Sequence, residues 1–336
     1  MSSGAWLAVD GGQSGIRLRL STGAQATADG VQHRPGGNVP VMLGSLRAAL
    51  RELGEPRVQV AALGMSGLFQ EPGPLRELAD GVMAATGADR VLLSGDDVTG
   101  HAGALRGRPG VVAAIGTGTT VIGLSPDGRF TSVDGRGYLL GDDGSGFDLG
   151  RRGLRAVLEH AEGLAPATAL TRAAVARFGP VEHLAHAIYR SAAPVAAVAS
   201  FARDVISAAG ASQDGEAPAP SADTTHCPDR EAPAGPGPDP TAAALVRTAM
   251  QALARSIRAA AGGFGGTPVP VVVVGGLMRS ADVLLPPLTE ALDQHLPSAV
   301  IQQPLGTALD GAAWLASNDA GVYEPMVHRH RAPATE

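Results

Sequence analysis

The stretch AVDGGQSG at residues 8–15 joins a short apolar run to the alternating segment IRLRL at residues 16–20. An apolar strand, a glycine-rich turn and a strictly alternating strand are typical of a β-hairpin. A second unit of the same kind, VVAAIGTGTT at residues 111–120, leads into an apolar strand at residues 120–124. The two units predict an internal repeat, with one hairpin near the start of each half of the chain.

The first glycine-rich turn has the composition of a phosphate-binding loop. Gly11 and Gly12 free the backbone to turn tightly and to point several N–H groups at an anion, and Gln13 and Ser14 complete the loop. Asp10, at the end of the strand, is placed to hold Mg²⁺ through water, because Mg²⁺ keeps part of its hydration shell. The alternative is a plain hairpin turn with a surface aspartate.

The second turn follows the same logic, with Gly116 and Gly118 freeing the backbone and Thr117 and Thr119 supplying hydroxyl groups. Two such hairpins are suited to grip a nucleotide from both sides of a cleft. The chain contains no lysine, since all 26 basic residues are arginine. This excludes the GxxxxGK[ST] loop and the lysine grip of protein kinases, so phosphate contacts fall to backbone amides, arginine and a metal ion.

Two pairs of adjacent aspartates follow apolar or glycine-rich segments. Asp96 and Asp97 come after the strand VLLSG, where carboxylates suit a general base and a metal or sugar ligand. Asp142 and Asp143 lie between glycines in GYLLGDDGSGFDLG at residues 137–150, where carboxylates can hold sugar hydroxyls. For both pairs the alternative is an acidic cap at a helix start.

A β-branched run at residues 271–274 predicts a strand buried on both faces. Gly275 and Gly276 end this strand and allow an adenine or ribose to pack flat against the backbone. The alternative is an ordinary strand-to-helix turn.

The chain of 336 residues is long enough for two domains, which we expect at 1–107 and 108–336. Hydrophobic residues make up 44% and charged residues 17%, as in a packed globular protein. Residues 211–240 are rich in Pro, Ala, Asp and Ser without an apolar period, which predicts a disordered surface insertion. We expect Thr241 to cap the next helix and the tail HRHRAPATE to be loose.

Several classes of protein are disfavoured by composition. The net charge of −6 and the lack of a basic stripe disfavour a nucleic-acid partner. No apolar stretch approaches the length of a membrane span, and the first residues lack the pattern of a secretory signal. Cys227 is the only cysteine, so no intrachain disulfide forms, and we expect a cytoplasmic location.

The order of these motifs resembles the N-acetylglucosamine kinase-like branch (BadF/BadG/BcrA/BcrD ATPase family) of the actin–hexokinase–heat-shock ATPase superfamily. The resemblance runs from about residue 5 to residue 316 apart from the insertion, and residues 137–150 are its most specific part. It departs from the family at Gly15, where lysine or another polar residue is common, and at Asp143, where glutamate is usual. At Thr120 some sugar kinases of this branch have an asparagine that touches the sugar, which leaves the sugar open.

The resemblance implies an α/β protein with two ribonuclease-H-like domains, an actin-like ATPase fold, on either side of a nucleotide cleft. It implies ATP between the hairpins, near Gly275 and Gly276, and a metal linked to Asp10. It matches Asp96 to the catalytic base, with Asp97 as the near rival. The residues that fall where sugar contacts are expected are Asn38, Ser66, Gly67, Asp96, Thr120 and Asp142.

We therefore predict a kinase that uses ATP and Mg²⁺ to phosphorylate an amino sugar, most directly N-acetylglucosamine at its 6-hydroxyl, with glucosamine as the alternative. One rival function is an ATPase activator with an iron–sulfur cluster, but this needs cysteine ligands, and Cys227 lies in the predicted disordered insertion. A second rival is a non-catalytic sugar sensor, although no DNA-binding motif is present. We expect no nucleic-acid or membrane partner, and a homodimer stays open because dimers are the commonest oligomers.

Overall fold

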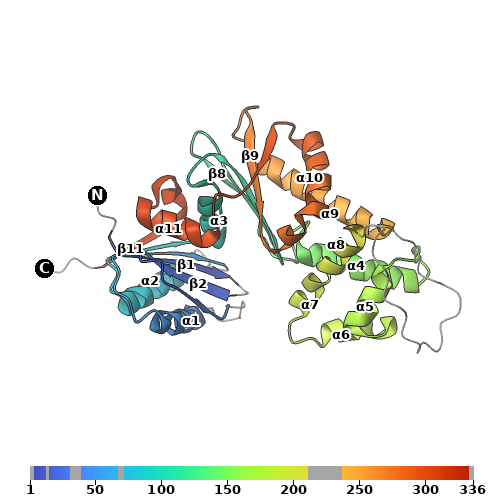
Figure 1. Ribbon diagram of the computed structural model, residues 1–336, viewed down its shortest axis with the longest axis horizontal. Coiled ribbons are helices and arrows are strands. Elements are labelled where there is room, and N and C mark those ends of the chain that lie inside the picture. Colours follow the sequence, from blue (N-terminus) through green and yellow to red (C-terminus); the bar gives the residue numbers. More distant parts are fainter. Residues whose placement is uncertain (1–3, 13–14, 31–38, 67–71, 211–236, 333–336) are drawn as a thin grey trace.

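The computed structural model describes residues 4–12, 15–30, 39–66, 72–210 and 237–332, which form two mixed β-sheets with helices around them (Figure 1). The first sheet has the strand order β11-β5-β4-β1-β2-β3, and the second has the order β10-β9-β6-β7-β8. The strands of the first sheet are β1 (Trp6–Gly12), β2 (Gly15–Leu20), β3 (Gln25–Ala28), β4 (Val60–Met65), β5 (Arg90–Ser94) and β11 (His328–Arg331). Those of the second are β6 (Gly110–Ile115), β7 (Thr119–Leu124), β8 (Phe130–Asp134), β9 (Val269–Val274) and β10 (Ala299–Gln302).

Both sheets follow one plan. In the first, β1–β2 and β2–β3 are antiparallel pairs, and β4 and β5 add in parallel on the other side of β1. In the second, β6, β7 and β8 repeat the antiparallel part, and β9 and β10 repeat the parallel part. The predicted repeat and the predicted α/β class with two sheets are both confirmed.

The first sheet is covered on both faces because its central strands are apolar on both sides. All six residues of β4 are buried, and so are most of β1. Helices α1 (Val39–Glu52) and α2 (Pro72–Thr86) bury their apolar stripes on one face, and α3 (Asp96–Leu105) and α11 (Ala308–Asn318) cover the other. Burial on both faces is the usual state of parallel strands and holds their carboxyl ends in fixed positions.

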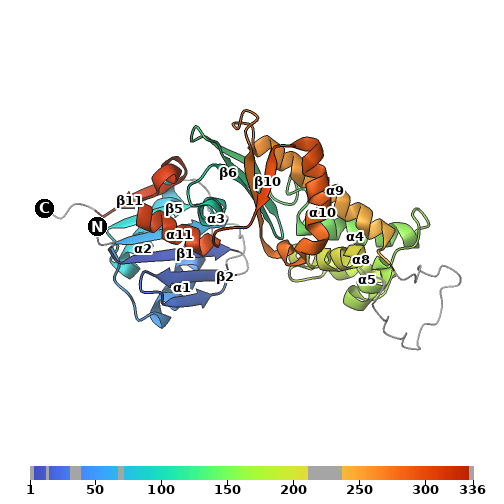
Figure 2. The same ribbon diagram turned by 45° about the horizontal axis from the view of Figure 1, so that its top comes forward.

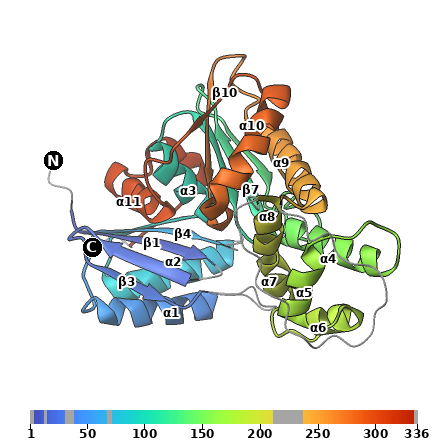
Figure 3. The ribbon, with the colours of Figure 1, turned by 45° about the vertical axis from the view of Figure 1, so that its right-hand side comes forward.

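The second sheet carries a larger group of helices, which Figure 3 shows gathered on one side of it. Helix α9 (Pro240–Ala260) lies against β6, β7 and β8, and α10 (Ala281–His295) packs on α9. The remaining helices are α4 (Gly146–Ala161), α5 (Leu170–Phe178), α6 (Leu184–Tyr189), α7 (Pro194–Ser200) and α8 (Ala202–Gly210). Their buried residues form one core with those of β6, β7 and β9.

Two helices carry the chain between the sheets. Helix α3 leads from β5 to β6, and α11 leads back from the second sheet to the first, so the two lie against each other (Figure 2). Their contact needs glycine, because a Cβ at Gly103 would lie 1.9 Å from the Thr307 carbonyl oxygen, and one at Gly311 would lie 1.8 Å from that of Thr99. The backbones of the two crossing segments therefore touch directly.

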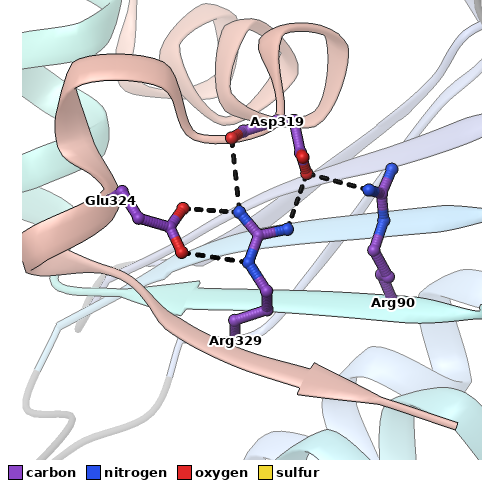
Figure 4. Close-up of polar contacts among 4 residues, drawn as sticks. All are labelled: Arg90, Asp319, Glu324 and Arg329. Carbon is purple, nitrogen blue, oxygen red and sulfur yellow. Dashed lines mark hydrogen bonds and ion pairs between the residues drawn. The ribbon is translucent and has the colours of Figure 1, made fainter.

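The expectation of a loose tail is wrong for residues 328–331, which form β11 at the edge of the first sheet, paired with β5. Arg329 explains why this strand is held. Its guanidinium binds the Asp319 carboxylate at 2.6 Å and the Glu324 carboxylate at 2.5 Å, and Arg90 of β5 binds Asp319 at 3.0 Å (Figure 4). Pairing and charge together outweigh the ordering entropy of a short terminal segment.

The start of α9 differs from the prediction at Thr241. The capping residue is Asp239, whose carboxylate accepts a hydrogen bond from the Ala242 amide at 2.7 Å, and Pro240 occupies the first helical position. Proline suits that position because its missing N–H would have no partner there. The rest of the predicted insertion, residues 211–236, lies outside the described residues.

The division of the chain at residue 107 stays a prediction. The return of α11 and β11 to the first sheet is a feature that this division did not include. Within the described part of the chain, every helix is too short or too polar to cross a bilayer.

Candidate active site

Three parallel strands of the first sheet end beside one another, and polar side chains follow each of them. Asp10 lies near the end of β1, Ser66 follows β4, and Asp96 and Asp97 begin α3 directly after β5. The Ser66 amide donates to the carbonyl oxygen of Gly11 at 2.7 Å, which ties the segment after β4 to the first glycine-rich turn. The carboxyl edge of such a sheet is where α/β proteins place ligands.

Asp10 is a buried carboxylate with an arginine directly beside it. Its side chain forms an ion pair with Arg17 at 2.5 Å, across the β1–β2 hairpin where the two residues are register partners. Burial raises the pKa of Asp10, and the Arg17 guanidinium opposes this rise. Sequence reasoning missed Arg17, because it predicted the hairpin without the register that places this arginine opposite Asp10.

Asp96 carries the most perturbed carboxyl group of this cluster. Burial raises its pKa to about 6, the negative charges of Asp97 and Asp10 add to the rise, and a hydrogen bond from the Ser66 side chain opposes it. A carboxylate whose pKa lies near neutral pH is a stronger proton acceptor than an ordinary surface aspartate. The group is therefore suited to take a proton from a substrate hydroxyl.

Asp97 is engaged differently. Its Oδ1 accepts a hydrogen bond from the Val98 amide at 2.8 Å, within the first turn of α3. Burial also raises its pKa. The N-cap position itself is Gly95, which has no side chain to cap the helix. Asp97 thus satisfies the helix start, whereas Asp96 points its carboxylate toward Ser66 and Asp10.

The second glycine-rich turn is held in shape by the start of α4. The Gly146 amide donates to the carbonyl oxygen of Gly116 at 2.8 Å, and the Phe147 amide donates to that of Thr117 at 3.0 Å. The amides of Thr117 and Gly118 donate to no backbone carbonyl among the described residues. Amides left free at such a turn are suited to bind phosphate oxygens.

Asp142 lies directly against this turn. Its side chain is 7% exposed, and a Cβ at Gly118 would lie 2.5 Å from its Oδ2. Burial raises its pKa, and the nearby backbone amides of Gly137, Thr119 and Gly135 oppose the rise. Its Oδ1 and the Oγ1 of Thr119 are both buried without a hydrogen-bond partner in the described structure. Buried polar atoms without partners are rare, so this pair is a place where a ligand or water is expected to bind.

The other predicted residues near this turn are placed as follows. Gly275 has φ +108°, and a Cβ there would lie 2.3 Å from the Ile115 carbonyl oxygen, so only glycine fits against the end of β6. Gly276 faces open space, since an added Cβ would meet no atom within 4 Å. Thr120 is half-buried on β7 and pairs with Asp134 of β8.

Four predicted residues, Gln13, Ser14, Asn38 and Gly67, lie outside the described residues. The predicted site residues that are described form two groups, one at the carboxyl edge of each sheet. The first holds Asp10, Gly11, Gly12, Ser66, Asp96 and Asp97; the second holds Gly116, Thr117, Gly118, Thr119, Thr120, Asp142, Gly275 and Gly276.

No three His, Cys, Asp or Glu residues gather into a metal-binding group within the described ranges. A nucleotide-bound Mg²⁺ does not need such a group, because one or two carboxylates, phosphate oxygens and water complete its shell. Asp10, with Asp96 as a charged neighbour, fits that requirement.

Comparison with known proteins decides the family. A sequence model of the BadF/BadG/BcrA/BcrD ATPase family matches residues 19–218, which is more than half of the chain. The chain belongs to this family. The BadF/BadG/BcrA/BcrD assignment confirms the resemblance drawn from the motifs.

A curated relative of this family member is the N-acetylmuramic acid/N-acetylglucosamine kinase of Clostridium acetobutylicum, 30% identical over 121 residues. That match covers 35% of this chain and 40% of the length of the relative.

Solved structures agree over nearly the whole chain. A candidate N-acetylglucosamine kinase from Chromobacterium violaceum has a TM-score of 0.70 at 27% identity, over 94% of this chain and 100% of the other. A ROK family glucokinase from Streptomyces griseus, solved with glucose and AMPPNP, has a TM-score of 0.55 at 16% identity, over 94% and 99% of the two chains. The glucokinase shows the fold alone.

Proposed function

We propose that this BadF/BadG/BcrA/BcrD family member is an ATP-dependent kinase that phosphorylates an amino sugar, most directly N-acetylglucosamine at the 6-hydroxyl. The observation that carries the proposal is the setting of Asp96, a carboxylate with a pKa near 6 at the edge of the first sheet, beside Asp10. The names of the Clostridium acetobutylicum and Chromobacterium violaceum proteins support a sugar as the acceptor.

In this reaction Asp96 accepts the proton of the sugar hydroxyl as the oxygen attacks the γ-phosphorus of ATP. The new bond joins that oxygen to phosphorus, and the bond between the γ-phosphorus and the bridging oxygen breaks, so that ADP leaves. Phosphoryl transfer depends mainly on positioning and on neutralising charge on the phosphate oxygens. The amides of Thr117 and Gly118, which have no backbone acceptor among the described residues, are suited to neutralising that charge. Gly275 and Gly276 are suited to a flat contact with the adenosine.

Asp10 would hold Mg²⁺, which supplies positive charge to the phosphates when bound. The sugar contacts that we propose are Asp142 and Ser66 together with Asn38, Gly67 and Thr120. Asp142 suits this role because a buried carboxylate oxygen without a partner gains most from a donating hydroxyl group. Closure of the two halves on the sugar would exclude water and limit ATP hydrolysis.

The related functions differ in what they require. An iron–sulfur activator needs cluster ligands, and this chain offers only Cys227, which lies outside the described residues. A sugar sensor needs no proton acceptor, so the environment of Asp96 favours the kinase. Glucosamine remains the nearest alternative substrate.

The test is a coupled assay of ADP release with Mg²⁺, ATP and a panel of sugars: N-acetylglucosamine, glucosamine, N-acetylmannosamine and N-acetylmuramic acid. We expect ADP release that depends on an amino sugar, and loss of that activity in Asp96→Asn. Release of ADP at the same rate without sugar would contradict the proposal. Loss of activity in Asp97→Asn but not in Asp96→Asn would show that Asp97 is the general base instead of Asp96. Sedimentation of the same sample tests the predicted homodimer.

A further inference from the structure

A chain of hydrogen bonds lies buried between the two sheets, outside the residues discussed so far. His101 of α3 is 0% exposed, and its ring centroid lies 6.4 Å from that of Phe130 of β8. Tyr323, which follows α11, is also 0% exposed and packs edge-on against the imidazole ring at 5.7 Å. Polar groups in such a place are stable only if each finds a partner.

Each polar atom of the His101 and Tyr323 side chains has a hydrogen-bond partner. The Nδ1 of His101 lies 2.8 Å from the Tyr323 hydroxyl, and its Nε2 lies 3.2 Å from the Gly110 carbonyl oxygen. The Gly107 amide donates to the Tyr323 hydroxyl at 3.2 Å. Since a carbonyl only accepts, Nε2 carries the hydrogen, and Nδ1 accepts from the hydroxyl. The direction of every bond is therefore fixed for a neutral imidazole.

The charge state agrees with that assignment. Burial lowers the pKa of His101 to about 4, and the hydrogen bond with the Gly110 carbonyl opposes this fall. Burial also raises the pKa of Tyr323 well above its usual value. Neither group titrates near neutral pH, so the hydrogen bonds of His101 and Tyr323 keep one arrangement there.

The three linked segments lead to the two halves of the candidate site. Asp96 is the first residue of α3, five residues before His101. Gly110 is the first residue of β6, which runs directly to the turn at Gly116. Tyr323 follows the returning helix α11, 222 residues after His101. One imidazole thus contacts the helix that begins with the proposed base, the strand that ends at the proposed phosphate turn, and the returning segment.

We propose that His101 and Tyr323 are positioning residues, whose hydrogen bonds fix α3 against β6 and so align the Asp96 carboxylate with the amides of Thr117 and Gly118. The inference rests on the proposed phosphoryl transfer. Apolar contacts alone allow packed segments to slide, whereas a satisfied buried hydrogen-bond chain specifies one geometry. Misplacement of reacting groups by about 1 Å is sufficient to slow a reaction about 10²-fold.

The test compares three substitutions with a control that has a purely structural role. Tyr323→Phe removes only the hydroxyl, His101→Leu removes both bonds, and His101→Gln keeps a donor and an acceptor. Thr168→Val is the control, because Thr168 is 0% exposed and binds Asp239 at 3.1 Å, far along the chain from α3 and α11.

We expect Tyr323→Phe and His101→Leu to lower kcat about tenfold or more, with KM for sugar and ATP within about twofold of the wild type. His101→Gln should recover most of kcat. Thr168→Val should lower the melting temperature and leave kcat unchanged. If His101→Leu and Thr168→Val lose stability to the same degree and both keep wild-type kcat, the positioning role is refuted.

A second measurement separates this inference from the proposed function. Long-range ¹H–¹⁵N spectra of the histidine rings should show His101 as the neutral Nε2–H form, with an Nδ1 signal that moves when Tyr323 becomes Phe. If the wild type phosphorylates no sugar but these shifts occur, only the proposed function fails. If the Nδ1 signal stays in place in Tyr323→Phe, the hydrogen bond on which the positioning role depends is absent, and that role fails.

Discussion

Replacing the Asp96 carboxylate should make the protein less active and more stable. The pKa of Asp96 lies near 6 in the folded protein and at 3.8 in an unperturbed chain. Each pKa unit corresponds to about 1.4 kcal/mol, so ionisation of Asp96 destabilises the fold by about 3 kcal/mol above pH 6. Asp96→Asn removes that charge and its repulsion with Asp97 and Asp10.

The sign of the pH dependence follows from the raised pKa. The destabilisation is complete above the folded value near 6, shrinks as pH falls toward 3.8, and disappears below it. We therefore expect Asp96→Asn to gain about 3 kcal/mol in unfolding free energy at pH 8 and only a small part of that at pH 4. Asparagine can still form a hydrogen bond with Ser66, so the substitution should cost little stability at this contact.

Urea unfolding at pH 8 and pH 4 measures this gain, with Glu77→Gln as the control because Glu77 is exposed on α2. The control should change the unfolding free energy by less than about 0.5 kcal/mol at either pH. Meanwhile kcat of Asp96→Asn should fall by about 10²–10⁴-fold if the carboxylate is a general base. An Asp96→Asn protein that is no more stable than the wild type at pH 8, or that gains equally at both pH values, would refute the reasoning.

Three further outcomes are expected. Gly311→Ala should destabilise the protein by about 3 kcal/mol or more in urea, because its Cβ would overlap a backbone carbonyl of α3, whereas Gly44→Ala, with nothing within 4 Å, should stabilise it by about 0.5–1 kcal/mol. The neutral form of His101 is favoured by folding, so its contribution is present above pH 6.5 and is lost as pH falls toward 4; His101→Gln should flatten that part of a melting-temperature profile. Arg17→Gln should lower the Mg²⁺ concentration for half-maximal activity, because the Arg17 guanidinium competes for the Asp10 carboxylate.

Local patterns were sufficient for the parts of the molecule that are local in sequence. The strand–turn–strand units at residues 8–20 and 111–124 predicted two hairpins, because both strands and the turn of a hairpin lie in one continuous segment of sequence. The same stretches contain the glycine turns and Asp10. The position of Asp96 after a buried strand was equally visible, since an apolar run followed by Gly-Asp-Asp marks a strand end.

Features that join distant segments were not predictable by these rules. Nothing near Tyr323 indicates that its hydroxyl meets His101, 222 residues earlier in the chain. The tail at residues 328–331 contains alternating basic residues and no apolar pattern, so its pairing with β5 depends on Asp319 and Glu324, which bind Arg329 only in the folded protein. Contacts of this kind follow from topology, which the local sequence does not encode.

The two acidic turns show how structure decides between readings that sequence leaves open. Capping was the alternative for both pairs, yet the side chain that caps α4 is that of Ser145, which accepts from the Asp148 amide at 3.2 Å. The Asp142 side chain is not the cap. At α3 the Val98 amide is satisfied by Asp97, whereas the Asp96 carboxylate forms hydrogen bonds with its own amide and with the Ser66 side chain. A carboxylate without an ion pair in the described structure, whose ionisation is opposed by burial and by two neighbouring carboxylates, lowers stability. Its presence at the edge of the sheet is therefore better explained by chemistry than by folding.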